Sequence, residues 1–171
     1  MSFKKLQLPD FLIAELYKDV LVDLNTAETK VKKQKTPPSQ KWFLGENKKN
    51  VVIAVKDEEA VYLRDEWLQF LSAILGACKL NLGDVAIINY AKNNYSYTEL
   101  TEKLSPEFLL LLDITAKEIQ LPFTVPHYQI QQYNNCKFLL SPSLEIIQGN
   151  TQEAKLEKSK LWLSLKKMFN I

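Results

Sequence analysis

Three acidic residues begin one residue beyond one of the most apolar short segments of the chain. Val51–Val55 is a continuous aliphatic run, which is typical of a strand buried on both faces of a sheet. Asp57, Glu58 and Glu59 come next, in the loop where ligands of open α/β sheets gather. The loop has no glycine, which argues against a phosphate-binding turn. Neighbouring carboxylates diverge and usually face solvent, so a divalent-cation site is the less favoured interpretation.

Other residues that could support catalysis are scarce. His127 is the only histidine, and the sequence has four glycines, no G-x-S-x-G motif and no glycine-rich loop. Cys78 and Cys136 have no second cysteine or histidine at a ligand spacing, and Cys78 falls on an apolar helical stripe. The sequence therefore predicts no catalytic triad, no metal site and no cofactor.

The elements around this loop predict a parallel sheet. Residues 63–78 carry a broad apolar stripe at helical spacing, and Val85–Asn89 is a second buried strand. A strand, a helix and a strand of these lengths form a right-handed βαβ crossover. We therefore expect an α/β fold with a doubly wound, mostly parallel central sheet.

The second half of the chain continues this pattern. Phe108–Leu112 is a third buried strand, and Thr98 is the expected cap of a short helix before it. Residues 128–133 and 136–140 flank Asn134-Asn135 and predict a hairpin. A short helix (143–148) and a final helix (151–169) follow. The apolar stripe of the final helix is expected to face the core, with lysines on its solvated side; the stripe comprises Leu156, Leu161, Trp162, Leu165, Met168 and Phe169.

Residues 1–40 differ from the rest in pattern. Residues 2–23 alternate apolar and acidic positions at helical spacing, and residues 25–40 are polar and contain Pro37-Pro38. We expect an amino-terminal arm (residues 1–40), made of an amphipathic helix and a linker, and one α/β domain over 41–171. The arm helix either packs on its own domain or docks on a partner.

Composition favours a cytoplasmic protein without membrane contact. The chain is 46% hydrophobic with a net charge of +2, too little to indicate nucleic-acid binding by itself. No secretory signal and no run long enough to span a bilayer is recognised. The lysine-rich region from Lys30 to Lys49 is more typical of a solvated linker than of a phosphate site.

The carboxyl-terminal third carries a family resemblance. Leu139-Leu140-Ser141-Pro142-Ser143-Leu144, then a final helix with Leu161-Trp162, resembles the end of the DNA polymerase III psi subunit. The order of elements from Trp42 to Phe169 is also similar. The resemblance implies the three-layer α/β/α fold of uracil-DNA glycosylases without their activity. In those enzymes the corresponding turn reads His-Pro-Ser, and Ser141 stands in the histidine's place.

The resemblance implies a non-catalytic replisome accessory protein. Its arm would link the clamp loader, or other replisome proteins, to partners, with at most an indirect association with single-stranded DNA. Only the arm is carried over as a partner-binding segment. Its candidate residues are Phe3, Leu6, Leu8, Phe11, Leu12, Leu16 and Tyr17.

The alternative is a nucleic-acid-acting or nucleotide-binding enzyme of the glycosylase-like fold. Tyr90, Tyr95 and Tyr97 beside Lys92 could stack on a base, although a surface loop is the simpler interpretation. Such an enzyme would use the carboxyl edge of the sheet, which in an inactive relative would persist as a vestigial pocket. The residues expected there are Asp57, Glu58, Asn89, Tyr90, Ser141 and Ser143.

Overall fold

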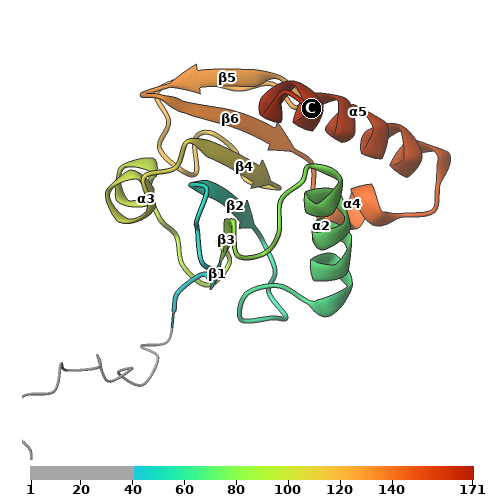
Figure 1. The fold of residues 1–171 in the computed structure, drawn as a ribbon, viewed down its shortest axis with the longest axis horizontal. Helices are drawn as coiled ribbons and strands as arrows, with labels where there is room; N and C mark the ends of the chain where they lie inside the picture. Colours follow the sequence, from blue (N-terminus) through green and yellow to red (C-terminus); the bar gives the residue numbers. More distant parts are fainter. Residues whose placement is uncertain (1–40) are drawn as a thin grey trace, which may run out of the picture. The chain divides into compact units, whose positions relative to one another are not determined.

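A computed structural model describes residues 41–171, which form a mixed α/β structure with a six-stranded sheet and four helices (Figure 1). The predictions for residues 1–40, including the partner-binding residues of the arm, lie outside this described part. The strands are β1 (Leu44–Gly45), β2 (Val51–Val55), β3 (Val85–Asn89), β4 (Phe108–Leu112), β5 (Ile130–Tyr133) and β6 (Cys136–Ser141). The helices are α2 (Asp65–Ala77), α3 (Tyr97–Leu104), α4 (Leu144–Gln148) and α5 (Gln152–Phe169).

The sheet is mostly parallel and doubly wound, as the sequence predicts. Its strand order is β1-β3-β2-β4-β6-β5, in which β3, β2, β4 and β6 run parallel and the two edge strands are antiparallel. The chain leaves β2 toward β3 and then returns past β2 to β4. The topological switch point therefore lies between β2 and β4, where ligands of such sheets usually bind.

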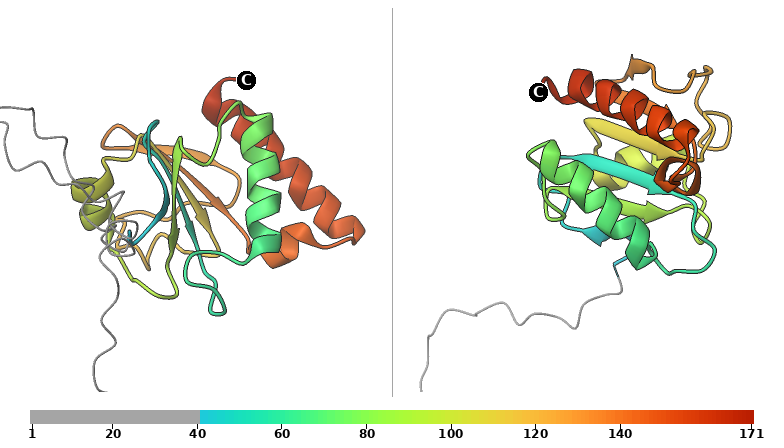
Figure 2. Two further views of the ribbon diagram at one scale, coloured as in Figure 1. Left: turned by 60° about the horizontal axis from the view of Figure 1, so that its bottom comes forward. Right: turned by 90° about the vertical axis from the view of Figure 1, so that its right-hand side faces the viewer.

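The two faces of the sheet are covered differently (Figure 2). Helices α2, α4 and α5 pack on one face, where α2 and α5 lie side by side. Helix α3 and the irregular segment 113–125 cover the other face. That segment supplies buried apolar side chains in place of a second long helix; they are Ile114, Ala116, Ile119, Leu121 and Val125. The third layer is thus only partly helical.

Most predicted elements are confirmed within a few residues, including the hairpin. Asn134 and Asn135 have φ values of 46° and 62°, the left-handed conformation that a two-residue hairpin turn requires. Two predictions are wrong. The cap of α3 is Ser96, which forms a capping box with Glu99, and not Thr98. Leu156 is 57% exposed because it lies off the buried stripe of α5.

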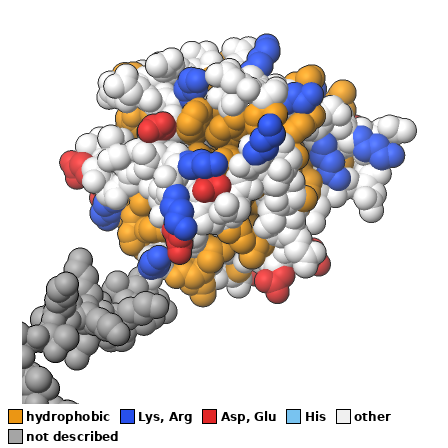
Figure 3. Space-filling model, in the orientation of Figure 1, with side chains coloured by type: hydrophobic (Ala, Val, Ile, Leu, Met, Phe, Trp, Pro, Cys, Tyr) orange, Lys and Arg blue, Asp and Glu red, His pale blue; other side chains and the backbone are white. Residues whose placement is uncertain are grey.

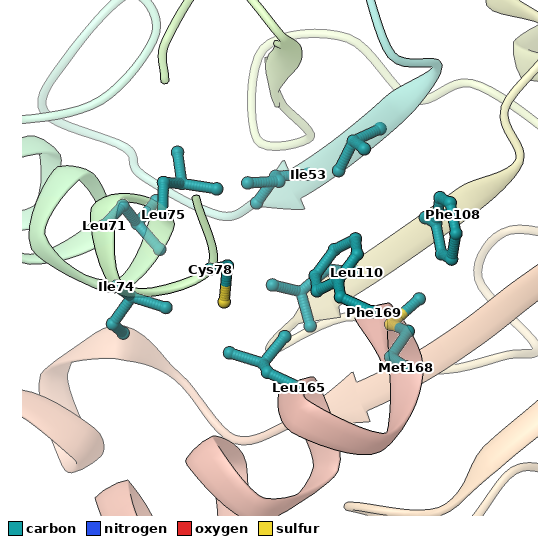
Figure 4. A pocket seen from close by; sticks show the side chains of 11 residues that line it. Ile53, Leu71, Ile74, Leu75, Cys78, Phe108, Leu110, Leu165, Met168 and Phe169 are labelled. Atoms are coloured by element: carbon teal, nitrogen blue, oxygen red, sulfur yellow. The ribbon is translucent and has the colours of Figure 1, made fainter. Parts of the chain in front are cut away.

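The core under α2 and α5 contains one small cavity, and Figure 4 shows the side chains that line it. A cavity of about 20 Å³ remains between these helices and strands β2 and β4. Its lining is apolar and includes Leu75, Cys78 and Leu165. A space of this size holds about one water, and its lining offers no strong polar partner, so we interpret it as a packing gap. No helix within residues 41–171 has the length and apolarity needed to cross a membrane.

Candidate functional site at the carboxyl edge of the sheet

Asp57 is a fully buried carboxylate just beyond the carboxyl end of β2. Its Oδ1 accepts hydrogen bonds from the Glu59 backbone N–H (3.0 Å) and from Arg64 Nη2 (3.1 Å). Its Oδ2 accepts from the Arg64 backbone N–H (2.9 Å) and from Arg64 Nε (3.2 Å). Four donors are the full complement of a carboxylate, so Asp57 has no free acceptor position for a substrate.

The charge of Asp57 is stabilised by these donors. Burial raises the pKa of the Asp57 carboxyl, but the hydrogen bonds from Arg64 and from two backbone amides outweigh burial, so its pKa lies below the ordinary value. Arg64 is fixed in turn by Trp67, whose ring centroid is 4.0 Å from the guanidinium carbon. The pair closes the loop between β2 and α2, which is a structural role.

Asn89, at the end of β3, ties the same loop to the sheet. Its Oδ1 accepts from the backbone N–H groups of Asp57 and Ala91, both at 3.1 Å. Its Nδ2 donates to the carbonyl oxygens of Asp57 (2.6 Å) and Ala60 (2.8 Å). The side chain is 1% exposed. The structure therefore brings Asp57 and Asn89 together, as the sequence predicts. Their hydrogen bonds, however, fix the backbone of the loop.

An ion pair bridges the switch point. Lys56, directly after β2, lies with its Nζ 2.5 Å from Glu118 Oε1, in the segment that follows β4. Glu118 Oε2 also accepts from the Thr115 backbone N–H at 2.7 Å. The buried Tyr90 hydroxyl donates to the Glu118 carbonyl oxygen at 2.8 Å. These contacts connect the two loops between which a ligand of an open α/β sheet would enter.

A shallow depression of about 500 Å³ remains beside this bridge. Glu58 and Tyr90, two of the predicted pocket residues, line it together with Lys56, Asn94 and Glu118. The Glu58 carbonyl oxygen accepts a hydrogen bond from Lys92 Nζ at 2.7 Å. The depression is thus a polar surface feature. It presents one aromatic ring, whose hydroxyl is already bonded, and an exposed carboxylate.

Ser141 and Ser143 do not line this depression. Ser143 caps α4 by accepting from the Ile146 backbone N–H at 3.4 Å. Ser141 is 1% exposed at the end of β6, and its Oγ has no hydrogen-bond partner among residues 41–171. Its hydroxyl lies close enough to the Tyr128 phenol to lower the pKa of that phenol, but without the geometry of a hydrogen bond.

Tyr128 forms a second polar cluster that sequence reasoning did not identify. Its hydroxyl donates to Glu157 Oε2 on α5, and its carbonyl oxygen accepts from Ser164 Oγ at 2.8 Å. Burial, followed by the hydrogen bond to Glu157, raises the pKa of the phenol well above its usual range. The cluster attaches α5 to the start of β5. His127 lies beside it on the surface, with its ring centroid 6.2 Å from that of Tyr128, and forms no hydrogen bond to either cluster within residues 41–171.

The most important residue missed by sequence reasoning is Arg64. It is the only arginine of the chain and follows Asp57 by seven residues, a signal that could have suggested an ion pair. Within residues 41–171, no group of three or more histidine, cysteine, aspartate or glutamate side chains could hold a metal ion. The loop after β2 offers two solvated carboxylates, Glu58 and Glu59, of which Glu59 pairs with Arg64 Nη1 at 3.4 Å. Within the described residues no base is placed next to a nucleophile.

Neither the protein-family models nor the curated proteins compared with this chain give a match.

Proposed function

We propose that this chain is a non-catalytic replisome accessory protein that resembles the psi subunit of DNA polymerase III. Its arm (residues 1–40) would dock on clamp-loader subunits or other replisome proteins. Its α/β domain would serve as the scaffold that carries the arm. We further propose that this domain has the three-layer α/β/α fold of the uracil-DNA glycosylases. The proposal rests on the sequence resemblance together with the state of the carboxyl edge.

The bonding of Asp57 is the observation that carries the proposal. In an enzyme of the glycosylase-like fold, the loop after the first strand of the βαβ unit would present reactive groups. Here its only buried carboxylate accepts four hydrogen bonds, three of them from Arg64. A carboxylate whose lone pairs are all used by its own loop supports folding, which favours a scaffold over a catalyst.

The position of Ser141-Pro142-Ser143 agrees with the same proposal. The turn joins β6 to α4, and Ser143 caps that helix. Ser141 is buried and does not line the depression that Glu58 and Tyr90 line. From this position the Ser141 side chain does not face a nucleobase that would be bound in the depression.

A pull-down tests the docking role of the arm. The full chain and a variant carrying Leu12→Glu and Leu16→Glu are immobilised and incubated with purified clamp-loader complex. We expect the full chain to retain the complex and the variant to lose it, because two charges are placed in the apolar stripe. Glu15→Gln with Asp19→Asn, on the polar side of the same stripe, is the matched control. Equal retention by all three proteins would refute the docking role.

The depression beside Tyr90 is the feature that favours the alternative, an enzyme of the glycosylase-like fold. A uracil-excision assay on single-stranded and double-stranded DNA tests it. Excision that is lost in Glu58→Gln would establish the alternative and overturn the scaffold proposal. We expect no excision at high protein concentration.

A further inference from the structure

An apolar groove lies on the outer surface between α2 and α5. It encloses about 270 Å³ and is lined almost wholly by apolar atoms. Leu161 and Leu165 are buried at its base, and the half-buried rings of Phe70 and Trp162 stand in its walls. The two helices lie side by side in Figure 2, and the groove lies between them.

The groove exists because α2 presents small side chains there. Ala73 and Ala77 line it, are one helical turn apart and are both exposed. A long side chain at either position would cover the neighbouring Phe70 and Trp162 instead of leaving them half-buried. The α2 surface is thus shaped as a concave apolar strip.

A row of lysines follows the α5 side of the groove. Lys155, Lys158 and Lys166 lie at helical spacing with Trp162, so they share one stripe of α5. Lys158 Nζ is 5.6 Å from the Phe70 ring centroid, and Lys166 Nζ is 5.3 Å from that of Trp162. None of the three forms an ion pair with a carboxylate of residues 41–171. Lysines stand beside hydrophobic side chains over the part of Figure 3 where α5 lies.

We propose that this groove binds an acidic amphipathic helix of a partner protein. The apolar face of such a helix would fill the strip over Ala73 and Ala77 and bury Phe70 and Trp162. Its carboxylates would pair with the lysine row, in which no cation has a carboxylate partner from the domain. A helix laid in a groove between two helices is a recurrent mode of peptide recognition. The proposal concerns the domain alone and does not depend on the role of the arm.

A nucleic acid or an anionic membrane fits the surface less well. Phosphate binding needs cations along the path of the nucleic-acid backbone, whereas lysines follow only one side of this groove. Its two aromatic rings, Phe70 and Trp162, stand in the walls of an apolar groove and are only half-exposed, so they form no open stacking platform. Membrane binding needs apolar side chains that protrude, whereas these are recessed between two helices. An acidic helix matches both the concave shape and the charge.

Fluorescence anisotropy with the full chain tests the proposal. The probe is a labelled helical peptide with leucines on one face and glutamates on the other. A peptide with lysines in place of the glutamates, an oligothymidylate strand and phosphatidylserine vesicles are measured in parallel. Ala73→Gln fills the groove with a good helix former, and Ala77→Gln is an independent second variant. Lys166→Glu reverses a charge of the row. Lys167→Glu is its matched control, since Lys167 is exposed and lies off the stripe.

We expect the acidic peptide to bind more tightly than the other three probes. Each glutamine variant should weaken binding about tenfold, because it excludes the apolar face of the peptide. Lys166→Glu should weaken it about fivefold and Lys167→Glu less than about twofold. No binding of the acidic peptide, tighter binding of the oligonucleotide or the vesicles, or equal effects of the two lysine variants would each overturn the proposal. The groove variants leave the arm residues unchanged and the arm variants leave the groove residues unchanged, so each proposal is tested by its own set of substitutions.

Discussion

Replacing Asp57 by alanine should destabilise the domain strongly, although the residue lies in a loop. The substitution removes a fully buried carboxylate and leaves four donors without their acceptor. Breaking a buried ion pair costs about 3–5 kcal/mol. The Arg64 side chain is 34% exposed, so water compensates part of its loss. We therefore expect the free energy of unfolding to fall by about 2–4 kcal/mol.

Urea unfolding followed by tryptophan fluorescence measures this change. Trp67 packs against Arg64 and should report the opening of the loop. Glu58→Ala is the matched control, because Glu58 is an exposed carboxylate one residue away and its loss should change stability by less than about 0.5 kcal/mol. Arg64→Lys keeps the charge but loses the contact through two nitrogen atoms. Its loss of unfolding free energy should lie between those of Asp57→Ala and Glu58→Ala. A loss below about 1 kcal/mol for Asp57→Ala, or an equal loss for Glu58→Ala, would refute the structural role of Asp57.

Three further predictions follow from buried groups. The folded-state pKa of Asp57 lies below its unfolded value near 3.8. Its stabilising contribution is therefore complete above about pH 4 and is lost as the pH falls further. The difference in unfolding free energy between the wild type and Asp57→Ala should shrink below about pH 4. Ser141→Ala should leave the free energy of unfolding unchanged or raise it by up to about 1 kcal/mol, because it removes a buried hydroxyl that has no partner among residues 41–171. A loss above about 1 kcal/mol in denaturant unfolding would contradict this prediction. Cys78 and Cys136 are buried, and burial raises the pKa of the Cys136 thiol to about 12. A disulfide reagent should therefore modify these thiols only as fast as the domain unfolds. Rapid labelling of the native protein would contradict this prediction.

Hydrophobic periodicity was sufficient to predict the parallel sheet. Val51–Val55 and Val85–Asn89 are parallel neighbours in the sheet, and their buried runs leave little choice of element type. The hairpin was predictable because Asn134-Asn135 tolerates the positive φ that its turn needs. Periodicity could not predict that segment 113–125 replaces a helix on one face, because its irregular apolar residues have no helical spacing.

The site was predictable in position but not in bonding. Asp57 and Asn89 meet because parallel strands end at one edge, a consequence of topology. The hydrogen bonds that occupy them depend on Arg64 and on backbone amides of the loop, whose directions sequence patterns do not contain. The Tyr128–Glu157 contact joins residues 29 positions apart in elements with no shared pattern, so nothing in the sequence indicated it.

The affinity of the full chain for purified clamp-loader complex, measured in solution by isothermal titration calorimetry, tests the proposed function most directly. We predict that the full chain binds and that Leu12→Glu with Leu16→Glu weakens the affinity at least about tenfold. We also predict that Glu58→Gln leaves the affinity unchanged. Absence of binding by the full chain, or equal binding by the arm variant, would contradict the proposed function.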